Sequence, residues 1–545
     1  MQTAKYIFVT GGVISSLGKG VLVSSLAKLI QARGYAVTCI KCDMYVNIDA
    51  GTMRPTEHGE VFVGEDGIEA DQDLGNYERF ISQRSTAMHY ITTGQIYREV
   101  IRRERNLEYN GEDVEVVPHV PEEIIRRITL AGSKSKAEVV LVEFGGTVGE
   151  YQTVLFLEAD RMMKRSEPEN VINIHISYLP IPQSVGEMKT KPVQYSVRTL
   201  NAAGIQPEFV VGRSEKPMDK KRKDKISDFC SVPVAHVISN PDVKSIYELP
   251  LVLDEQQFGE NVLKALKLPL RTKNIAQWKA LVAKIQTVKK TVAVGIVGKY
   301  YASGEFSLED AYISVREAIK HAAWAVDRDP VIAWIDAEEF EKKKSSLEMR
   351  LKNLSAVIIP GGFGGRGVEG KIAAIQYARE HGIPFLGLCY GMQLAVIEFA
   401  RNVLGIADAE SEEFNAQTKN PVIHIMREQI QKLQKKKYGA SMRLGAYPCV
   451  LKNNSLAQKA YGVKRISERH RHRYEFNNIY RERCENAGLI VVGVSPDNTL
   501  VEIVELKKHP FFVGVQFHPE FLSRPLQAHP LFVGLLQAAK VRSTT

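Results

Sequence analysis

The sequence predicts two doubly wound α/β domains, the first of them built around a parallel sheet with helices on both faces. Short, almost continuous apolar runs alternate with amphipathic stretches, which is typical of strands buried in a parallel sheet. The chain has 545 residues, more than one hydrophobic core usually supports. Its character changes over 268–290, a polar, basic and partly helical stretch that we interpret as a linker. The predicted domains are therefore 1–267 and 291–545.

The strand-like segments follow one another along the chain, separated by helical patterns. In the first domain they are YIFVT (6–10), AVTCIK (36–41), EVVLVEFGG (138–146), NVINIHIS (170–177), EFVVGRS (208–214) and VAHVIS (234–239). In the second domain they are TVAVGIVGKY (291–300), AVIIPGGFGG (356–365) and the run from Pro384 to Leu388, which precedes a predicted helix from Met392 to Ala400. Parallel strands need long crossover connections, and the helical stretches between these runs supply them.

Composition and charge favour an ordinary globular protein with small polyanionic ligands. Hydrophobic residues make up 44% of the chain and charged residues 25%. The sequence has no apolar run of membrane-spanning length and no basic-then-apolar leader, so we expect a cytoplasmic location. The net charge is +9, but Lys and Arg are interleaved with acids and no nucleic-acid motif occurs. We expect neither nucleic acid nor a membrane as partner.

The six cysteines do not suggest a disulfide framework in so long a chain. Cys39 and Cys42 form a C-x-x-C on a predicted strand, with no second pair and no nearby His. We therefore expect no metal or redox role for that pair.

A glycine-rich loop, GGVISSLGKG (11–20), joins the first strand to the first helix. Backbone N–H groups and a helix N-terminus in this position cradle phosphates, and Lys19 adds a point charge. The loop departs from the standard P-loop, because five residues separate Gly12 from Gly18 and Gly20 stands where Ser or Thr would bind the metal. A simple tight turn is the alternative, which the position between strand and helix disfavours.

Nucleotide phosphates call for a divalent cation and further cationic groups. Asp73 lies in an acidic cluster (65–75), and Glu143 ends a buried strand, where ligands of α/β sheets collect. We therefore expect both to bind a metal. Basic residues in 186–194 and 216–225 are a candidate second triphosphate site, and a solvated charged face is the alternative.

Cys389 is the predicted nucleophile of the second domain. Gly387, Cys389 and Gly391 form a G-x-C-x-G pattern between a strand and a helix, so the thiol stands at a helix N-terminus that favours the thiolate. Far downstream, His518 and Glu520 offer a base and an acid that orients it. The alternative, a buried structural cysteine, explains neither the flanking glycines nor the distant His-x-Glu.

Taken together, these motifs resemble the CTP synthase family over nearly the whole chain. The landmarks are GGVISSLGKG, GTMRPTEHGEVFV (51–63), DLGNYERF (73–80), EFGGTVGE (143–150), GEMKTKPVQ (186–194), PGGFGGRGVEGK (360–371), GLCYGMQ (387–393), RHRHRYEFNN (469–478) and QFHPE (516–520). The resemblance implies a P-loop-like, dethiobiotin-synthetase-like domain followed by a class I glutamine amidotransferase domain.

The resemblance also implies roles for individual residues. ATP would be held by Ser16, Leu17, Gly18, Lys19, Gly20, Val21 and Asp73, and its Mg²⁺ by Asp73 and Glu143. UTP or CTP would be held by Ser15, Glu150, Tyr151, Gln152, Lys189, Thr190, Lys191, Pro192, Val193, Gln194 and Lys225. Cys389, His518 and Glu520 would be catalytic, and glutamine would be held by Gly362, Tyr390, Gly391, Met392, Gln393, Glu413 and Arg473. His58 and Val61 resemble residues that line the family's ammonia passage.

The implied reaction is the ATP-dependent amination of UTP to CTP. ATP would phosphorylate the uracil O4, and ammonia released from glutamine through a thioester on Cys389 would displace the phosphate. GTP as activator, CTP as feedback inhibitor and a homotetramer are implied by the resemblance alone. Departures from the family pattern include Glu150, Gln152, Val193 and Tyr195 near the nucleotide pocket. A further departure, Tyr390, replaces a usual Leu at a position where we expect mainly the backbone to matter.

Three alternatives stay open from the sequence. A cobyrinate-type amidase also joins a dethiobiotin-synthetase-like domain to an amidotransferase-like one, but it should lack the second triphosphate site of Lys189, Lys191 and Lys225. A partitioning-type P-loop ATPase with an inert C-terminal domain is a second alternative, which an intact Cys389, His518 and Glu520 disfavour. A chiefly structural, filament-forming role is the third.

Overall fold

The computed structural model describes residues 4–299, 302–303, 306–307, 309–342, 346–426 and 442–542. Contacts within the chain divide it into two compact units. Unit 1 comprises 1–50 and 73–282, and unit 2 comprises 51–72 and 283–545. The units differ from the predicted domains mainly in the segment 51–72, which lies in the N-terminal half of the sequence but groups with the C-terminal half.

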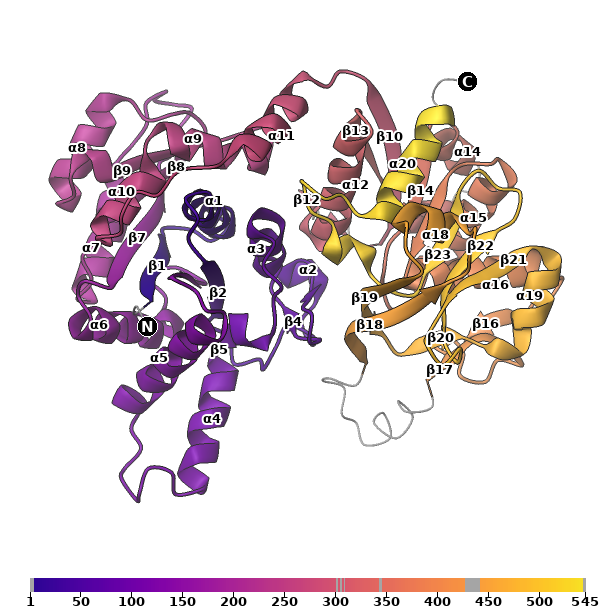
Figure 1. The fold of residues 1–545 in the computed structure, drawn as a ribbon, viewed down its shortest axis with the longest axis horizontal. Helices are drawn as coiled ribbons and strands as arrows, with labels where there is room; N and C mark the ends of the chain where they lie inside the picture. The colour runs from indigo at the N-terminus through magenta and orange to yellow at the C-terminus, as the bar shows by residue number, and fades with distance from the viewer. Residues whose placement is uncertain are drawn as a thin grey trace. The chain divides into compact units, whose positions relative to one another are not determined.

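Unit 1 is built on a parallel sheet with the strand order β5-β2-β6-β1-β7-β8-β9 (Figure 1). Every neighbouring pair in it is parallel, as the sequence predicts. Successive residues of β1 point to opposite faces, and Ile7, Phe8 and Val9 are all fully buried, so both faces are covered. The strands are β1 (Lys5–Gly12), β2 (Val37–Asp43), β5 (Tyr90–Thr92), β6 (Val139–Phe144), β7 (Val171–Tyr178), β8 (Phe209–Ser214) and β9 (Val237–Pro241).

Helices cover this sheet on both sides, because each crossover between parallel strands carries one. They are α1 (Lys19–Gln31), α3 (Asp73–Ile81), α4 (Thr93–Arg105), α5 (Val116–Lys134), α6 (Val154–Ser166), α7 (Lys191–Ala202), α8 (Lys220–Cys230), α9 (Leu249–Glu255) and α10 (Phe258–Ala265). α11 (Ala276–Thr287) follows within the predicted linker. Cys39 and Cys42 are buried on β2, and burial raises the pKa of both thiols.

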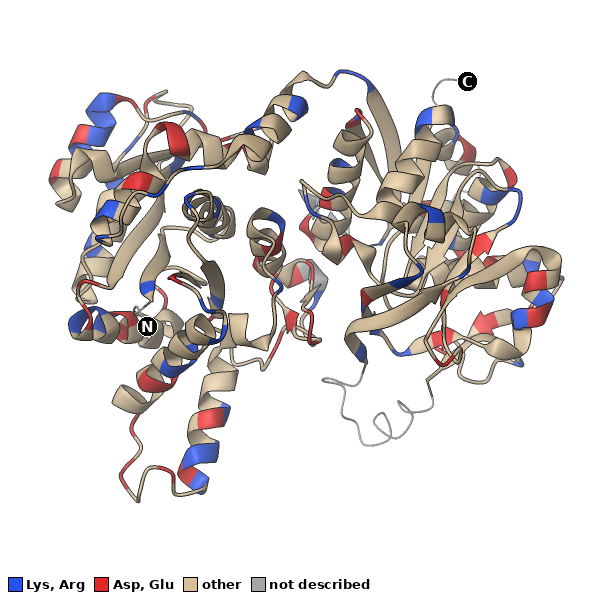
Figure 2. Ribbon diagram, in the orientation of Figure 1, with Lys and Arg blue, Asp and Glu red and all other residues tan. Residues whose placement is uncertain are grey.

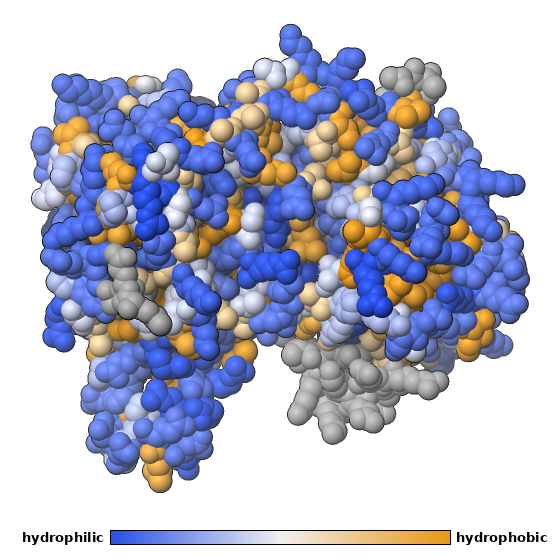
Figure 3. Space-filling view, viewed as in Figure 1, coloured by the Kyte–Doolittle hydropathy of each residue, from blue (hydrophilic) through white to orange (hydrophobic). Residues whose placement is uncertain are grey.

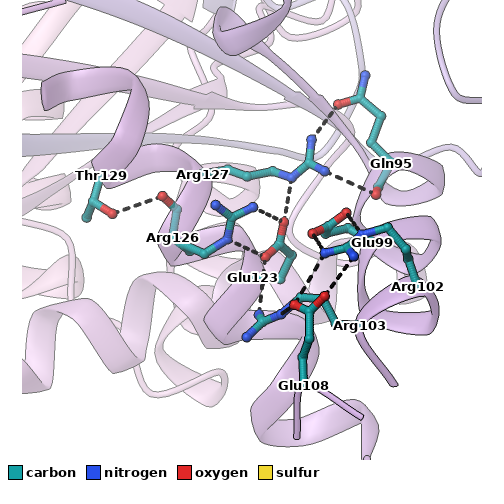
Figure 4. Close-up of polar contacts among 9 residues, drawn as sticks. All are labelled: Gln95, Glu99, Arg102, Arg103, Glu108, Glu123, Arg126, Arg127 and Thr129. Atoms are coloured by element: carbon teal, nitrogen blue, oxygen red, sulfur yellow. Dashed lines mark hydrogen bonds and ion pairs between the residues drawn. The ribbon is translucent and has the colours of Figure 1, made fainter. Parts of the chain in front are cut away.

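An ionic network joins α4 to α5 in unit 1 (Figure 4). The Glu123 carboxylate is fully buried and accepts hydrogen bonds from Arg126 (2.6 Å) and Arg127 (2.8 Å) on its own helix. Arg127 also donates to the side-chain oxygen of Gln95 on α4 (3.0 Å). The buried carboxylate therefore has charged partners, and those partners link the two helices.

Unit 2 contains a mixed sheet in the order β13-β10-β14-β15-β23-β22-β21-β18-β19. The strands from β13 to β23 pair in parallel, and the strands from β23 to β19 pair antiparallel. The parallel part comprises β10 (Thr291–Gly298), β13 (Asp329–Asp336), β14 (Ala356–Ile359), β15 (Phe385–Leu388) and β23 (Phe512–Val515). The antiparallel part adds β18 (Arg443–Leu451), β19 (Arg465–His472), β21 (Leu489–Val494) and β22 (Val501–Leu506).

Smaller sheets and the helices complete unit 2. The small sheets pair β3 (Phe62–Val63) with β4 (Glu69–Ala70), β11 (Ala302–Ser303) with β12 (Phe306–Ser307), and β16 (Ala409–Ser411), β17 (Asn420–Ile425) and β20 (Tyr474–Phe476). The helices are α2 (Pro55–His58), α12 (Ile313–Ala325), α13 (Ala337–Lys342), α14 (Ser346–Leu351), α15 (Val368–Glu380), α16 (Tyr390–Asn402), α18 (Leu456–Tyr461), α19 (Arg481–Ala487) and α20 (Pro530–Arg542).

The segment 51–72 is held in unit 2 by ring contacts and hydrogen bonds. Phe62 packs edge-on against Phe521 with ring centroids 5.1 Å apart. The fully buried Arg469 donates to the Val63 carbonyl (3.0 Å). Arg471 donates to the Glu69 carboxylate (2.7 Å). Because these anchors come from the far C-terminal part of the chain, sequence order alone did not reveal the grouping.

Charged residues of both signs are interleaved along the helices rather than separated into fields, as Figure 2 shows. Hydrophilic residues predominate on the face drawn in Figure 3. Among the helices that the structure describes, none combines the length and apolar character needed to cross a membrane.

Candidate functional sites

The glycine-rich loop of unit 1 leaves β1 at Gly12 and enters α1 at Lys19. Val13, Ser16 and Gly18 have positive φ angles of 77°, 58° and 78°. Left-handed residues within a tight loop turn successive N–H groups toward one side, which is the geometry that binds anions. The backbone therefore supports the predicted phosphate loop.

Lys19 folds back over this loop. Its Nζ donates to the Gly146 carbonyl (2.8 Å), which belongs to the loop after β6. Burial lowers the pKa of Lys19, while the nearby carboxylate of Glu143 opposes that shift. Because β6 and β1 are neighbours in the sheet, both loops end at the same edge.

The predicted metal ligands meet at a lysine that the sequence analysis missed. Lys41 of β2 forms ion pairs with Asp73 and with Glu143 (3.0 Å to Oε1). Tyr77 donates to the other oxygen of Glu143 (2.5 Å). Burial and the adjacent Asp73 charge raise the pKa of Glu143 to about 7. In the sequence, Lys41 stands out as a charged residue at the end of the strand-like run AVTCIK (36–41).

These two carboxylates fit a magnesium ion. Mg²⁺ prefers hard oxygen ligands, and a cation would stabilise the ionised form of the buried Glu143 carboxylate. Asp73 also packs against the first turn of α1, since a Cβ on Gly20 would lie 1.9 Å from its Oδ1. The acids therefore lie beside the phosphate loop.

A pocket of about 490 Å³ in unit 1 is lined by two of the predicted nucleotide residues. Its lining includes Lys191 and Pro192 at the start of α7, with Val13 of the phosphate loop and 147–149 after β6. Lys191 also lies over the rings of Tyr195 (5.9 Å) and Phe229 (5.4 Å). The pocket thus joins the phosphate loop to the predicted second triphosphate site.

Other predicted nucleotide residues lie outside the lining of that pocket. Glu150 accepts a hydrogen bond from the Thr147 N–H (2.7 Å) and another from the Gln152 amide (2.8 Å), so its carboxylate shapes the loop. Tyr151 is 97% exposed. Lys189 pairs with Glu187 (2.9 Å), and Lys225 is exposed on α8.

Cys389 occupies a strained elbow between β15 and α16. Its φ is +49° and its ψ is −97°, a conformation that a residue other than glycine rarely adopts. A Cβ on Gly391 would lie 2.2 Å from the Ile359 carbonyl oxygen, and one on Gly387 would lie 2.7 Å from the backbone of Gly391. The G-x-C-x-G pattern is therefore required by backbone packing, as the sequence analysis predicted.

His518 and Glu520 form the other part of this site. His518 Nδ1 lies 2.7 Å from Glu520 Oε1, which leaves Nε2 as the nitrogen for proton transfer. Burial alone would lower the pKa of His518, but the charges of Glu520 and Cys389 outweigh it and raise that pKa to about 10. The imidazole is thus held as an imidazolium beside the sulfur.

A cavity of about 80 Å³ joins these groups. Cys389, His518 and Glu520 line it together with Gly362 of the loop that follows β14. The segment 51–72 contributes Glu60 and Val61 to the same lining. His58 is half-buried and pairs with Asp71 (3.3 Å). Val61 therefore shares a cavity with Cys389 and His518.

The remaining predicted glutamine residues surround this cavity without lining it. Glu413 accepts a hydrogen bond from the Gly364 N–H (2.6 Å), and burial raises its pKa while nearby Arg473 opposes the shift. Gly391 and Met392 are buried within the first turn of α16. The Gln393 side chain donates to the Tyr474 carbonyl (2.9 Å).

The Tyr390 side chain makes contacts of its own at this position, where we expected mainly the backbone to matter. Its hydroxyl donates to the Gly364 carbonyl (2.6 Å), and its ring lies beneath Lys371 at 4.9 Å. The tyrosine therefore ties the elbow to the neighbouring glycine-rich loop, which a leucine could not do.

Sequence reasoning also missed three residues around the cysteine. Arg471 and Phe363 line the cavity, and Gln516 donates to Cys389 Sγ (3.6 Å). The signals were weak, because all three lie inside landmark motifs whose other members carry the better-known chemistry.

Fold and sites define a glutamine-dependent amidoligase, with a phosphate-binding unit and an amidotransferase unit on one chain. The family description "CTP synthase N-terminus" matches residues 5–268, and "Glutamine amidotransferase class-I" matches 307–538. The chain belongs to the CTP synthase family.

Its relatives match it over almost their full length. The CTP synthase of Trichormus variabilis is 49% identical, covering 99% of this chain and 97% of its own. That of Herpetosiphon aurantiacus is 50% identical, covering 98% of each. A solved structure, the Trypanosoma brucei CTPS glutaminase domain with bound acivicin, is 39% identical, covers 46% of this chain and 94% of its own, and has a TM-score of 0.41.

Proposed function

We propose that Cys389, His518 and Glu520 release ammonia from glutamine, and that the phosphate loop and Lys191 hold the nucleotides to which that ammonia is added. The overall reaction follows from the family: UTP is aminated to CTP at the expense of ATP, with glutamine as nitrogen donor. We favour this function over the three alternatives left open by the sequence: a cobyrinate-type amidase, a partner-binding ATPase and a chiefly structural protein.

In the amidotransferase unit, the Cys389 thiolate attacks the carboxamide carbon of glutamine. The oxyanion that forms is stabilised by the backbone of Gly362 and of the elbow. As the C–N bond breaks, His518 gives its Nε2 proton to the departing ammonia. Water then attacks the thioester while His518 takes its proton, glutamate leaves, and the thiolate returns. The residues proposed to hold glutamine are Tyr390, Gly391, Met392, Gln393, Glu413 and Arg473.

In the synthetase unit, the loop residues 16–21 hold the ATP phosphates, with Lys19 as the central charge. Asp73 and Glu143 would hold Mg²⁺, which when bound neutralises charge on the transferred phosphoryl group. Lys41 pairs with both carboxylates and thereby holds them together. UTP occupies the pocket of Lys191, where its O4 is phosphorylated and ammonia then displaces phosphate.

The finer assignments are also proposals. We propose domain boundaries of 1–267 and 291–545 around the linker 268–290, GTP as activator, CTP as feedback inhibitor and a homotetramer. They are supported by the family resemblance. A cytoplasmic location stays a prediction from the sequence.

The observation that carries the amidotransferase assignment is the Cys389 elbow, whose strained backbone presents the thiol in one cavity with His518. The test is CTP formation from UTP, ATP and Mg²⁺ with either glutamine or ammonium as nitrogen source. We expect Cys389→Ala to lose the glutamine-dependent reaction and to keep the ammonium-dependent one. Cys449→Ala is the matched control, since Cys449 is a buried cysteine of the same unit outside the cavity.

Two outcomes would contradict the proposal. Glutamine-dependent CTP formation by Cys389→Ala would remove the cysteine from the mechanism. If the wild-type chain formed no CTP from ammonium while still hydrolysing ATP, UTP would not be the substrate bound in the pocket of Lys191.

A further inference from the structure

We propose that Gln516 is a catalytic hydrogen-bond donor to the thiolate of Cys389, and that Gln393 and the Tyr474 carbonyl fix its amide in the donating orientation. The inference rests on the proposed role of Cys389 as nucleophile. It adds to the imidazole a second, uncharged group that stabilises the sulfur anion.

The sheet register places Gln516 beside the nucleophile. β15 and β23 are parallel neighbours, with Leu388 opposite Val515. Cys389 directly follows β15, and Gln516 directly follows β23. The Cys389 N–H donates to the Val515 carbonyl (2.7 Å), which extends the pairing to the elbow. Gln516 is 1% exposed, so water does not compete for its amide. Its Nε2 lies 3.6 Å from Cys389 Sγ, within the range of a hydrogen bond to sulfur.

A chain of amides determines which end of Gln516 faces the sulfur. The Tyr474 carbonyl can only accept, so the group that Gln393 presents to it at 2.9 Å must be the NH₂. The same NH₂ lies 3.3 Å from the Gln516 side chain, which must therefore present its oxygen there. The Gln516 NH₂ is left to face Cys389. The opposite orientation would oppose two NH₂ groups and turn an amide oxygen toward the thiolate.

Besides His518, a backbone carbonyl and the Gln516 amide lie near the sulfur, and they interact with it in opposite ways. The Arg471 carbonyl oxygen lies 3.7 Å from Cys389 Sγ and can accept from a thiol, but it repels a thiolate. The Gln516 amide donates, and its hydrogen bond is strengthened when the sulfur is ionised. Gln516 therefore offsets the carbonyl both before attack and when the thioester breaks and sulfur leaves as the anion.

The test is the rate at which iodoacetamide alkylates Cys389, followed at the Cys389 peptide by mass spectrometry at one fixed pH. Gln516→Leu removes the donor, and Gln516→Glu keeps the shape but replaces NH₂ by oxygen. Loss of a hydrogen bond to a charged group predicts an alkylation rate lower by about fourfold to twentyfold in both variants, because the greater nucleophilicity of a more basic sulfur offsets part of the loss of thiolate. The kcat of glutamine hydrolysis should fall with it while KM stays close to wild type, because Gln516 contacts the sulfur and not the substrate.

Gln393→Leu tests the orienting step. It frees the Gln516 amide to rotate, so alkylation should slow in Gln393→Leu alone but should not slow further when the substitution is added to Gln516→Leu. Iodoacetamide carries no α-amino acid group, so the proposed contact of Gln393 with glutamine does not affect this readout. Thermal unfolding reports whether the amidotransferase unit of each variant has folded, and the isosteric Gln516→Glu replaces Gln516→Leu if the latter fails this check.

Alkylation of folded Gln516→Leu and Gln516→Glu at the wild-type rate would overturn the inference. Additive losses in the Gln393→Leu, Gln516→Leu double variant would overturn the orienting role. If instead Cys389→Ala kept glutamine-dependent activity, the proposed nucleophile itself would be wrong, which is a distinguishable result.

Discussion

At the scale of single residues, the charge on His518 depends on the Glu520 carboxylate first and on Cys389 second. The raised pKa of His518 means that the folded protein holds a proton there that the unfolded chain loses near pH 6.5. A raised histidine pKa contributes stability that is fully present below pH 6.5 and is lost as the pH rises toward about 10. The same window bounds catalysis, because the imidazolium must protonate the leaving ammonia.

We predict that Glu520→Gln moves the alkaline limit of glutamine hydrolysis toward neutral pH by about one to three units. Removing the carboxylate removes the main charge that opposes the desolvation of the imidazolium. Glutamate release measured from pH 6 to 10.5 checks this, with ammonium-dependent CTP formation as the control for folding. An alkaline limit unchanged in the variant would contradict the proposed role of Glu520.

At the scale of elements, two features depend on tight local packing: the elbow between β15 and α16, and the contact between α4 and α5. We predict that Gly391→Ala destabilises the protein by about 1–3 kcal/mol, because its Cβ has to displace the Ile359 carbonyl. Thermal unfolding is the measurement. Gly365→Ala is the control, since a Cβ there meets no atom within 4 Å. Equal unfolding temperatures for both variants would contradict the packing argument.

The ionic contact between α4 and α5 should contribute more to the free energy of unfolding than a surface ion pair does. We predict that Glu123→Gln costs about 3 kcal/mol, the lower end for breaking a buried pair, because Arg126 and Arg127 keep part of their contact with water. Glu99→Gln, which disturbs a pair with the half-exposed Arg102, should cost at most about 1 kcal/mol. Chemical denaturation of the two variants separates these values, and a smaller loss for Glu123→Gln than for Glu99→Gln would contradict the prediction.

At the scale of the whole molecule, the chain passes from unit 1 to unit 2 after Ala50 and returns at Asp73. The intervening segment supplies part of the wall around Cys389. We predict that Glu69→Ala, which removes the partner of Arg471, lowers the yield of CTP per glutamate released, because the lining by Glu60 and Val61 loosens and ammonia escapes.

The measurement for this prediction is the ratio of CTP to glutamate during glutamine-dependent turnover. Glu57→Ala is the matched control, since Glu57 lies in the same segment in an exposed pair with Arg54. Ammonium-dependent CTP formation should be retained by both variants. A ratio in Glu69→Ala equal to that of the control would show that the segment does not retain ammonia.

Features that are local along the chain could be predicted from the amino-acid sequence. The strands around the phosphate loop and around Cys389 were predicted because apolar runs and glycine spacings are short-range signals, and the G-x-C-x-G elbow followed from backbone sterics. Contacts across long sequence separations became visible in the folded chain: Lys41 with Asp73 and Glu143, the segment 51–72 with Arg469 and Arg471, and Gln516 with Cys389. These contacts depend on sheet order and register, which no local pattern encodes.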